Sequence, residues 1–174
     1  CTVVPGHAWT GGNNAGHAGC GICWCCEKSD PNTHSRTAAE CPAGHDCLSL
    51  AGVQSPNEYA SGIDNDIYTN TAFASVLEWT TLAAELLGKP DPSQYSALAQ
   101  RIVIPFNRTL GRHEEYSGAP DALRIKQSTV TMVPYPVEYP MPPAVQRADL
   151  EYEAAHIGTE GPAMTHSMLA IDWL

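Results

Sequence analysis

The residue of this chain best suited to acid chemistry is Glu58, in the loop Ser55-Pro56-Asn57-Glu58-Tyr59. A carboxylate flanked by proline and tyrosine on a glycine-bearing loop can be held in a partly apolar cleft. Desolvation in such a cleft raises the pKa of a carboxyl group, so that it stays protonated and can donate to a glycosidic oxygen. The alternative is that Glu58 lies in solvent near the start of a helix and has no catalytic role.

Helices are predicted to position this loop. Asp64-Asn65-Asp66 supplies capping oxygens and negative charge for a helix N-terminus. Apolar residues then recur largely at spacings of three and four from Ile67 to Leu87, with Phe73 among them, until Gly88 and Pro90 end the helix. Because strand signals are scarce, this part of the chain is predicted to be all-α. The further helices are expected after Asp91-Pro92 and ending before Pro105, at 125–132, at 143–156 and at 162–174.

The first 47 residues differ from the rest of the chain. They hold all seven cysteines and four of the seven histidines, and show no sustained periodicity. We therefore predict an irregular Cys/Gly-rich head at 1–47 and a helical domain at 48–174. Three interpretations of the head remain open: it holds disulfides, it holds a structural zinc site, or it has no designed structure, as a mis-framed gene model would give. The zinc alternative would use Cys20, Cys23, Cys41 and Cys47, with His34 and His45 nearby.

Charge and hydropathy exclude two kinds of partner. Nine Lys plus Arg stand against 19 Asp plus Glu, a formal net charge of −10, so nucleic acid and anionic membrane surfaces are not expected. No apolar run approaches the roughly 20 residues that span a bilayer, and no signal peptide is visible at the start.

The sequon Asn107-Arg108-Thr109 points to the secretory route, hence to an extracellular or vacuolar, lysosome-like location.

The stretch Gly52 to Asn70 resembles the signature of glycoside hydrolase family 65, which holds acid trehalases and related α-glucosidases. In that family a Gly or Ser, Pro, Asp, Glu, Tyr or Phe motif carries the general acid and leads into an Asp-Asn-x-x-Tyr-Thr-Asn helix. This chain is similar but has Asn57 at the Asp position, which puts the hydrogen bonds of the loop in doubt. The resemblance continues, in order, through Ile104-Pro105-Phe106, His113-Glu114-Glu115-Tyr116, Ile125-Lys126-Gln127 and Gly161-Pro162-Ala163-Met164-Thr165.

The resemblance implies a fold, a reaction and three site residues. The fold would be an incomplete (α/α)6 barrel, an open arc whose apolar faces stay in contact with water. Glu58 would be the general acid, while Lys126 and Gln127 would bind hydroxyls of the glucose released from an α-glucosyl saccharide such as trehalose. No cofactor or metal is implied, and the oligomeric state is not indicated.

The implied mechanism is inverting, with a second carboxyl group about 6.5–9.5 Å away that activates water. The family's second glutamate is expected beyond Leu174, so we expect the isolated chain to be weakly active or inert. Glu115, Glu151 and Glu153 are the fallback candidates for the second carboxylate. We expect these three instead to be solvated carboxylates on helices or loops, with no catalytic role.

Two other functions remain open at this point. A disaccharide phosphorylase of the same family would carry a His-Asp-Ser-Ser segment that binds phosphate. This chain has Ala163-Met164-Thr165-His166-Ser167 instead, which favours water as the acceptor. A non-catalytic carbohydrate-binding or zinc-stabilised module is the second alternative.

Overall fold

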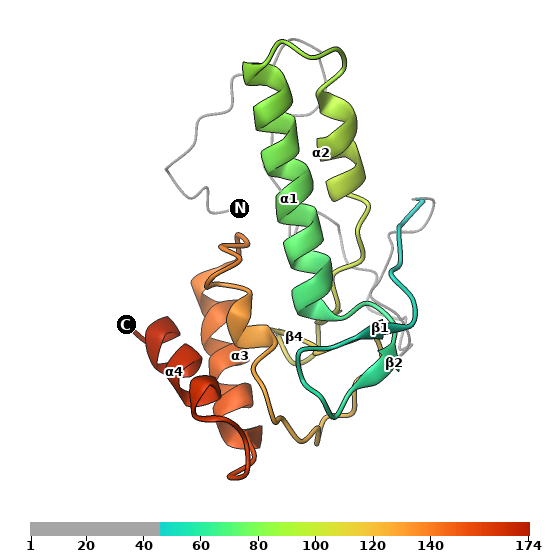
Figure 1. Cartoon of the computed structure of the whole chain (residues 1–174). Coiled ribbons are helices and arrows are strands. Elements are labelled where there is room, and N and C mark those ends of the chain that lie inside the picture. The colour runs from blue at the N-terminus through green and yellow to red at the C-terminus, as the bar shows by residue number, and fades with distance from the viewer. Residues whose placement is uncertain (1–45) are drawn as a thin grey trace. The chain divides into compact units, whose positions relative to one another are not determined.

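The computed structural model describes residues 46–174, all within one compact unit of the chain, Arg36–Leu174. Helices dominate the regular structure of these residues, with a few short strands (Figure 1). The helical class is therefore confirmed, whereas the boundary between 1–47 and 48–174 stays a prediction because residues 1–45 lie outside the described part. The elements are β1 (Val53–Gln54), β2 (Ser61–Ile63), α1 (Ile67–Leu86), α2 (Ser93–Ala99), β3 (Phe106–Asn107), β4 (Arg112–His113), the 3-10 turn η1 (Val130–Met132), α3 (Pro143–His156) and α4 (Ala163–Asp172).

Helix α1 begins and ends where the sequence predicts. The Asp66 carboxylate accepts hydrogen bonds from the Thr69 backbone N–H at 2.8 Å and from the Thr69 hydroxyl at 2.7 Å. At the other end Leu87 is the C-cap, and Gly88 takes a positive φ of 61° that an L side chain rarely adopts. The loop before α1 is thus joined to a helix with a defined start.

The helix predicted at 125–132 is wrong. Only η1 is helical there, and Ile125 instead forms a parallel β-bridge with Ile157, at the end of α3. The Ile125 N–H donates to the His156 carbonyl at 3.1 Å, and the Gly158 N–H donates to the Ile125 carbonyl at 2.8 Å. Long-range backbone pairing therefore overrides the local helical pattern at Ile125.

The other predicted helices are present with adjusted ends. Helix α3 has the predicted bounds, with Pro143 in its first turn, and α4 lies within the predicted 162–174. Helix α2 is shorter than predicted, because Ile102 leaves it to form a parallel bridge with Leu48. Asp91-Pro92 is a sequence pattern for a capping residue followed by proline in the first turn, but this prediction of a cap is wrong: Pro92 is the N-cap residue, and no side chain caps this helix.

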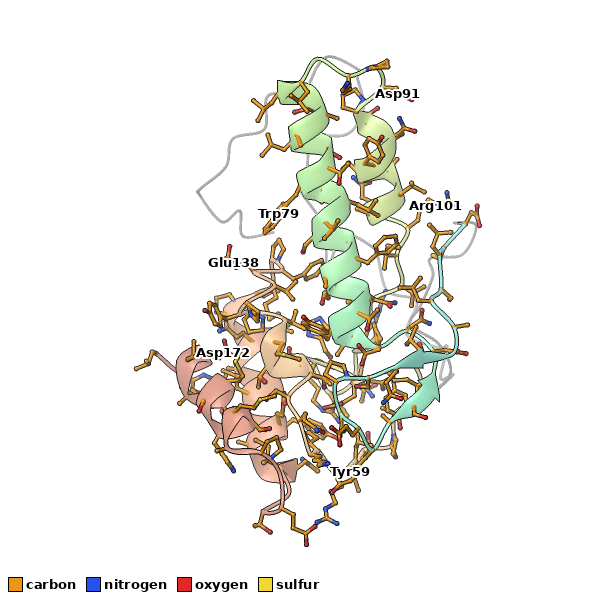
Figure 2. The ribbon with its side chains drawn as sticks, in the orientation of Figure 1. Tyr59, Trp79, Asp91, Arg101, Glu138 and Asp172 are labelled. Atoms are coloured by element: carbon orange, nitrogen blue, oxygen red, sulfur yellow. The ribbon has the colours of Figure 1, made fainter. Side chains whose placement is uncertain are left out.

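The apolar core lies around the start of α1, η1 and α3. Its most buried members include Ile67, Ile125, Val130, Val133 and Leu150. Most of the apolar face predicted along α1 is exposed instead, and Figure 2 shows Trp79 pointing away from α2. These apolar side chains are therefore in contact with water in the described structure. The exposed side chains on α1 and at its end are Phe73, Val76, Trp79, Leu82, Leu86 and Leu87.

The small sheets are hairpins that carry loops. β1 pairs with β2 and β3 with β4, each in antiparallel register. Helix α1 packs against α2, and α3 packs against α4 (Figure 1). Within residues 46–174, no helix has the length and apolar character to cross a membrane.

We predict that Asp66→Ala lowers the free energy of unfolding by about 1 kcal/mol, within a range of roughly 0.5–2 kcal/mol, because it removes the N-cap of α1. Urea unfolding followed by circular dichroism measures the change. Asp91→Asn is the control, since Asp91 caps no helix and asparagine tolerates its positive φ. Equal stability of the two variants would contradict the assignment of the cap.

Candidate active site

Glu58 lies in the loop that connects β1 to β2, and this loop is closed by its own hydrogen bonds. The Ser55 N–H donates to the Ala60 carbonyl at 3.2 Å, and the Ala60 N–H donates to the Asn57 carbonyl at 2.8 Å. The Asn57 N–H also donates to the Ser55 hydroxyl oxygen at 3.1 Å. The backbone on both sides of Glu58 is therefore held in one conformation.

Asn57 attaches this loop to segment 124–127. Its side chain is fully buried; Nδ2 donates to the Arg124 carbonyl at 3.3 Å, and Oδ1 accepts the Lys126 N–H at 3.2 Å. The doubt that Asn57 raised about the hydrogen bonds of the loop is thus answered, since these bonds are made. An ionised aspartate could not donate to the Arg124 carbonyl, so asparagine suits this contact.

The three residues that the sequence predicts for the site lie together. The Glu58 N–H donates to Gln127 Oε1 at 3.0 Å, and Lys126 Nζ donates to Glu58 Oε2 at 2.5 Å. These contacts join residues 69 and 68 positions apart. The hydrogen bonds of Asn57 to the backbone of Arg124 and Lys126 hold this segment against the loop.

The expected desolvation of Glu58 is wrong. Its side chain is 63% exposed and forms an ion pair with Lys126, whose side chain is 30% exposed. The hydrogen bond from Lys126 and its positive charge, aided by Gln127, hold the pKa of Glu58 below its ordinary value. The same hydrogen bond raises the pKa of Lys126. In this structure Glu58 is therefore a carboxylate rather than a proton donor.

A pocket of about 320 Å³ opens beside Glu58. Its volume is near the lower end of ligand pockets, about 300–1,000 Å³. Five side chains that can form hydrogen bonds and an apolar surface rich in methionine suit a ring that carries hydroxyl groups. The pocket is lined by Pro56, Glu58, Tyr68, Gln127, Ser128, Met132, Met164, Thr165 and Met168.

Sequence analysis found only part of this lining. Glu58 and Gln127 were predicted, and four further lining residues fall within motifs that carry the resemblance: Pro56, Tyr68, Met164 and Thr165. Ser128, Met132 and Met168 had no signal, because they join the lining only in the folded chain. Lys126 is not among the lining residues, although it contacts Glu58.

The fallback carboxylates are arranged differently from the expectation. Glu151 is exposed, as expected, but Glu115 and Glu153 are buried, so the expectation that they are solvated is wrong for both. Glu153 accepts hydrogen bonds from the Thr131 N–H at 2.7 Å and the Thr129 N–H at 3.4 Å. None of the three lines the pocket, so none is placed to activate water there.

Burial changes how the two inner carboxyl groups titrate. The pKa of Glu115 is raised to about 7, mainly by desolvation and also by the negative charge of Asp66, against the lowering effects of Thr129, Asn57 and Arg112. Desolvation also raises the pKa of Glu153 to about 8, with a contribution from the charge of Glu115. Both groups therefore favour the neutral form in the folded chain.

We predict that the chain is more stable in acid than at neutral pH. Because the folded-state pKa values of Glu115 and Glu153 are raised from 4.5, their stabilising contribution is complete below pH 4.5. It is lost as the pH rises through about 7 to 8, at up to roughly 1.4 kcal/mol per pH unit for each proton. Urea unfolding at pH 5, 6, 7 and 8 measures this dependence.

Glu153→Gln should flatten that pH dependence, because glutamine is neutral and can still accept from the Thr131 N–H. Glu151→Gln is the matched control, an exposed neighbour on the same helix, and should keep the wild-type slope. Indistinguishable slopes for the two variants would show that the buried carboxyl group does not carry the effect.

The described residues show no metal centre. No group of three or more His, Cys, Asp or Glu side chains within 46–174 is arranged to hold a metal ion. Cys47, one of the cysteines proposed for zinc, is disulfide-bonded. The other zinc candidates, Cys20, Cys23, Cys41, His34 and His45, lie outside the described residues.

Comparison with curated proteins finds relatives that are glycosidases by name, although no family model matches the chain. The protein-glucosylgalactosylhydroxylysine glucosidase of Mus musculus is 38% identical over 125 residues, 72% of this chain and 18% of that protein. A cell wall acid trehalase of Candida albicans is 33% identical over 126 residues, 67% of this chain and 11% of the trehalase. The kojibiose hydrolase of Mucilaginibacter mallensis is 33% identical over 141 residues, 79% of this chain and 20% of that enzyme. The chain thus matches a fifth or less of the length of each.

Proposed function

We propose that this chain, which belongs to glycoside hydrolase family 65 over the part that matches these relatives, carries the proton-donating and glucose-binding residues of an α-glucoside hydrolase. The observation that carries the proposal is that Glu58 and Gln127, 69 positions apart, are hydrogen-bonded and line one pocket. The relatives' names support a glycosyl substrate: glucosidase, trehalase and kojibiose hydrolase.

The proposed reaction is inverting hydrolysis of an α-glucosidic bond. The glucosyl ring lies in the pocket, where the Gln127 side chain binds a hydroxyl group. Glu58, once protonated, gives its proton to the leaving oxygen as the bond from the anomeric carbon to that oxygen breaks. Water adds to the opposite face of the ring with loss of a proton to a base, and β-glucose is released. The residues described here supply the acid half of this mechanism.

We also propose that residues 48–174 are an arc of an (α/α)6 barrel. The pairs α1 with α2 and α3 with α4 pack as neighbouring helices, as in helical hairpins. The apolar side chains along α1, such as Val76 and Leu82, are exposed where further helices of such a ring would pack.

An extracellular or vacuolar location is proposed from three observations. A relative from Candida albicans is named a cell wall acid trehalase, and one from Saccharomyces cerevisiae a periplasmic acid trehalase. Cys47 is disulfide-bonded, and disulfides persist in oxidising compartments. In the sequon Asn107-Arg108-Thr109, at the β3–β4 hairpin, Arg108 and Thr109 are exposed.

Methionine methyl groups give a direct test of binding. The chain has four methionines; Met132, Met164 and Met168 line the pocket, and Met141 does not. We predict that trehalose or kojibiose shifts the first three 13C-methyl signals and leaves that of Met141 unchanged. Shifts of all four signals together, or of none, would contradict a sugar site in this pocket.

The reaction itself is tested with a panel of α-linked glucosyl disaccharides, with the released anomer followed by NMR. We predict that β-glucose appears first, at a low rate for the isolated chain, and that Glu58→Gln abolishes its release. Release of the attacked glucosyl unit as α-glucose would contradict inversion; with trehalose, the leaving half gives one α-glucose in any case, so inversion predicts equal amounts of the two anomers. Equal sugar binding by both proteins without hydrolysis by either would favour a non-catalytic binding module, and glucose 1-phosphate formed in the presence of phosphate would favour a phosphorylase.

A further inference from the structure

The contacts of Glu58 conflict with its proposed role as a proton donor. A general acid must carry its proton when the glycosidic oxygen arrives. Glu58 is instead paired with Lys126 at 2.5 Å and is mostly exposed to water, and both conditions favour the carboxylate. Binding must therefore change the surroundings of Glu58 before it can donate.

Lys126 lies against Glu58 but does not line the pocket, whereas Glu58 and Gln127 do. The Lys126 ammonium also lies 5.8 Å from the centre of the Tyr59 ring. Glu58 thus lines the pocket, while its carboxyl group contacts a cation that is not among the lining residues. A ligand in the pocket can therefore change the surroundings of Glu58 without burying the Lys126 ammonium.

The other charged groups nearby are already paired with each other. The Arg124 guanidinium forms an ion pair with Glu160 at 2.9 Å and lies 5.7 Å from the centre of the Tyr59 ring. Glu58 has no hydrogen bond to Arg124 in the described structure, so Lys126 is the cation that holds its charge. Arg124 therefore offers a matched control for any effect of removing a nearby positive charge.

The chemistry of a glycosidic oxygen supplies the driving force. An ether oxygen accepts hydrogen bonds but has no hydrogen to donate, so against a carboxylate it would leave two acceptors opposed. Against a carboxylic acid it accepts a hydrogen bond. A glucoside in the pocket thus binds best to the protonated form of Glu58. Free glucose, with a hydroxyl group at the same position, can donate to the carboxylate and makes no such demand.

We propose that Lys126 is a counterion that a bound glucoside separates from Glu58, so that the carboxylate takes up a proton from solvent only while the pocket is occupied. The inference rests on the proposed function. It reassigns Lys126 from binding glucose hydroxyls to positioning Glu58 and controlling when Glu58 takes up its proton. After the proton passes to the leaving oxygen, the carboxylate forms again and pairs with Lys126. Glu58 is thereby protonated only when substrate occupies the pocket.

The test compares methyl α-D-glucoside with glucose, which differ at the oxygen that faces Glu58. Dissociation constants are taken from the methionine methyl titration between pH 5 and 8, with Met141 as the internal reference. For the wild type we expect glucoside binding to weaken with rising pH, by up to about tenfold per pH unit for one linked proton, while glucose binding stays nearly constant.

Variants separate the counterion role from simple sugar binding. Lys126→Met removes the ion pair that lowers the pKa of free Glu58. It should therefore tighten glucoside binding throughout pH 5 to 8 with a nearly unchanged slope, whereas Arg124→Gln should behave like the wild type. A lysine that only grips hydroxyls would instead lose affinity for both sugars on replacement. That result, or equal pH dependence of the two sugars in the wild type, overturns the inference and leaves the proposed function standing. Failure of the wild type to bind either sugar overturns both.

Discussion

The buried side chain of Asn57 is the constraint on which the site depends. Its amide joins the β1–β2 loop to segment 124–127 through one donated and one accepted hydrogen bond. Because both partners are backbone groups, the contact fixes the two segments rather than two mobile side chains. An unsatisfied buried amide would cost about 1–3 kcal/mol, so the loop and the segment are kept together. Glu58 and Gln127 meet as a consequence.

Four buried ionisable side chains lie on the segments around the site. The His113 Nδ1 and Asp149 Oδ2 are 2.6 Å apart, in a fully buried pair. Glu115 and Glu153 are buried nearby in sequence and structure, and burial raises the pKa of each carboxyl group. Ionised groups are costly in such surroundings, whereas neutral ones that accept backbone hydrogen bonds are tolerated. Burial of these carboxyl groups thus favours their neutral forms in the folded chain.

Sequence analysis succeeded where the signals are local. The Asp66 cap, the stop at Gly88 and the start of α3 at Pro143 depend on residues adjacent in sequence, and the structure has all three. It failed for 125–132, where the apolar spacing looks helical but Ile125 pairs with Ile157 across the fold. The periodicity of a short segment carries no information about a partner more than 30 residues away.

The site shows the same division between local and distant information. The motifs identified Glu58, Lys126 and Gln127, and the fold brings them together. Local composition around Glu58 suggested an apolar cleft, yet its protonation state is decided by Lys126, 68 positions away. The burial of Glu115 and Glu153 was missed because carboxylates are rarely buried without a paired charge. In each case the deciding contact is made only by folding.

The central claim is that Glu58 and Gln127 form a glucose-binding acid site. A crystal structure of the Glu58→Gln variant with trehalose or kojibiose tests it most directly. We expect the glucosyl ring in the pocket among the methionines, with the glycosidic oxygen within hydrogen-bond distance of the side chain at position 58 and a ring hydroxyl on Gln127. A disaccharide bound elsewhere, or one whose glycosidic oxygen lies far from position 58, would contradict the account.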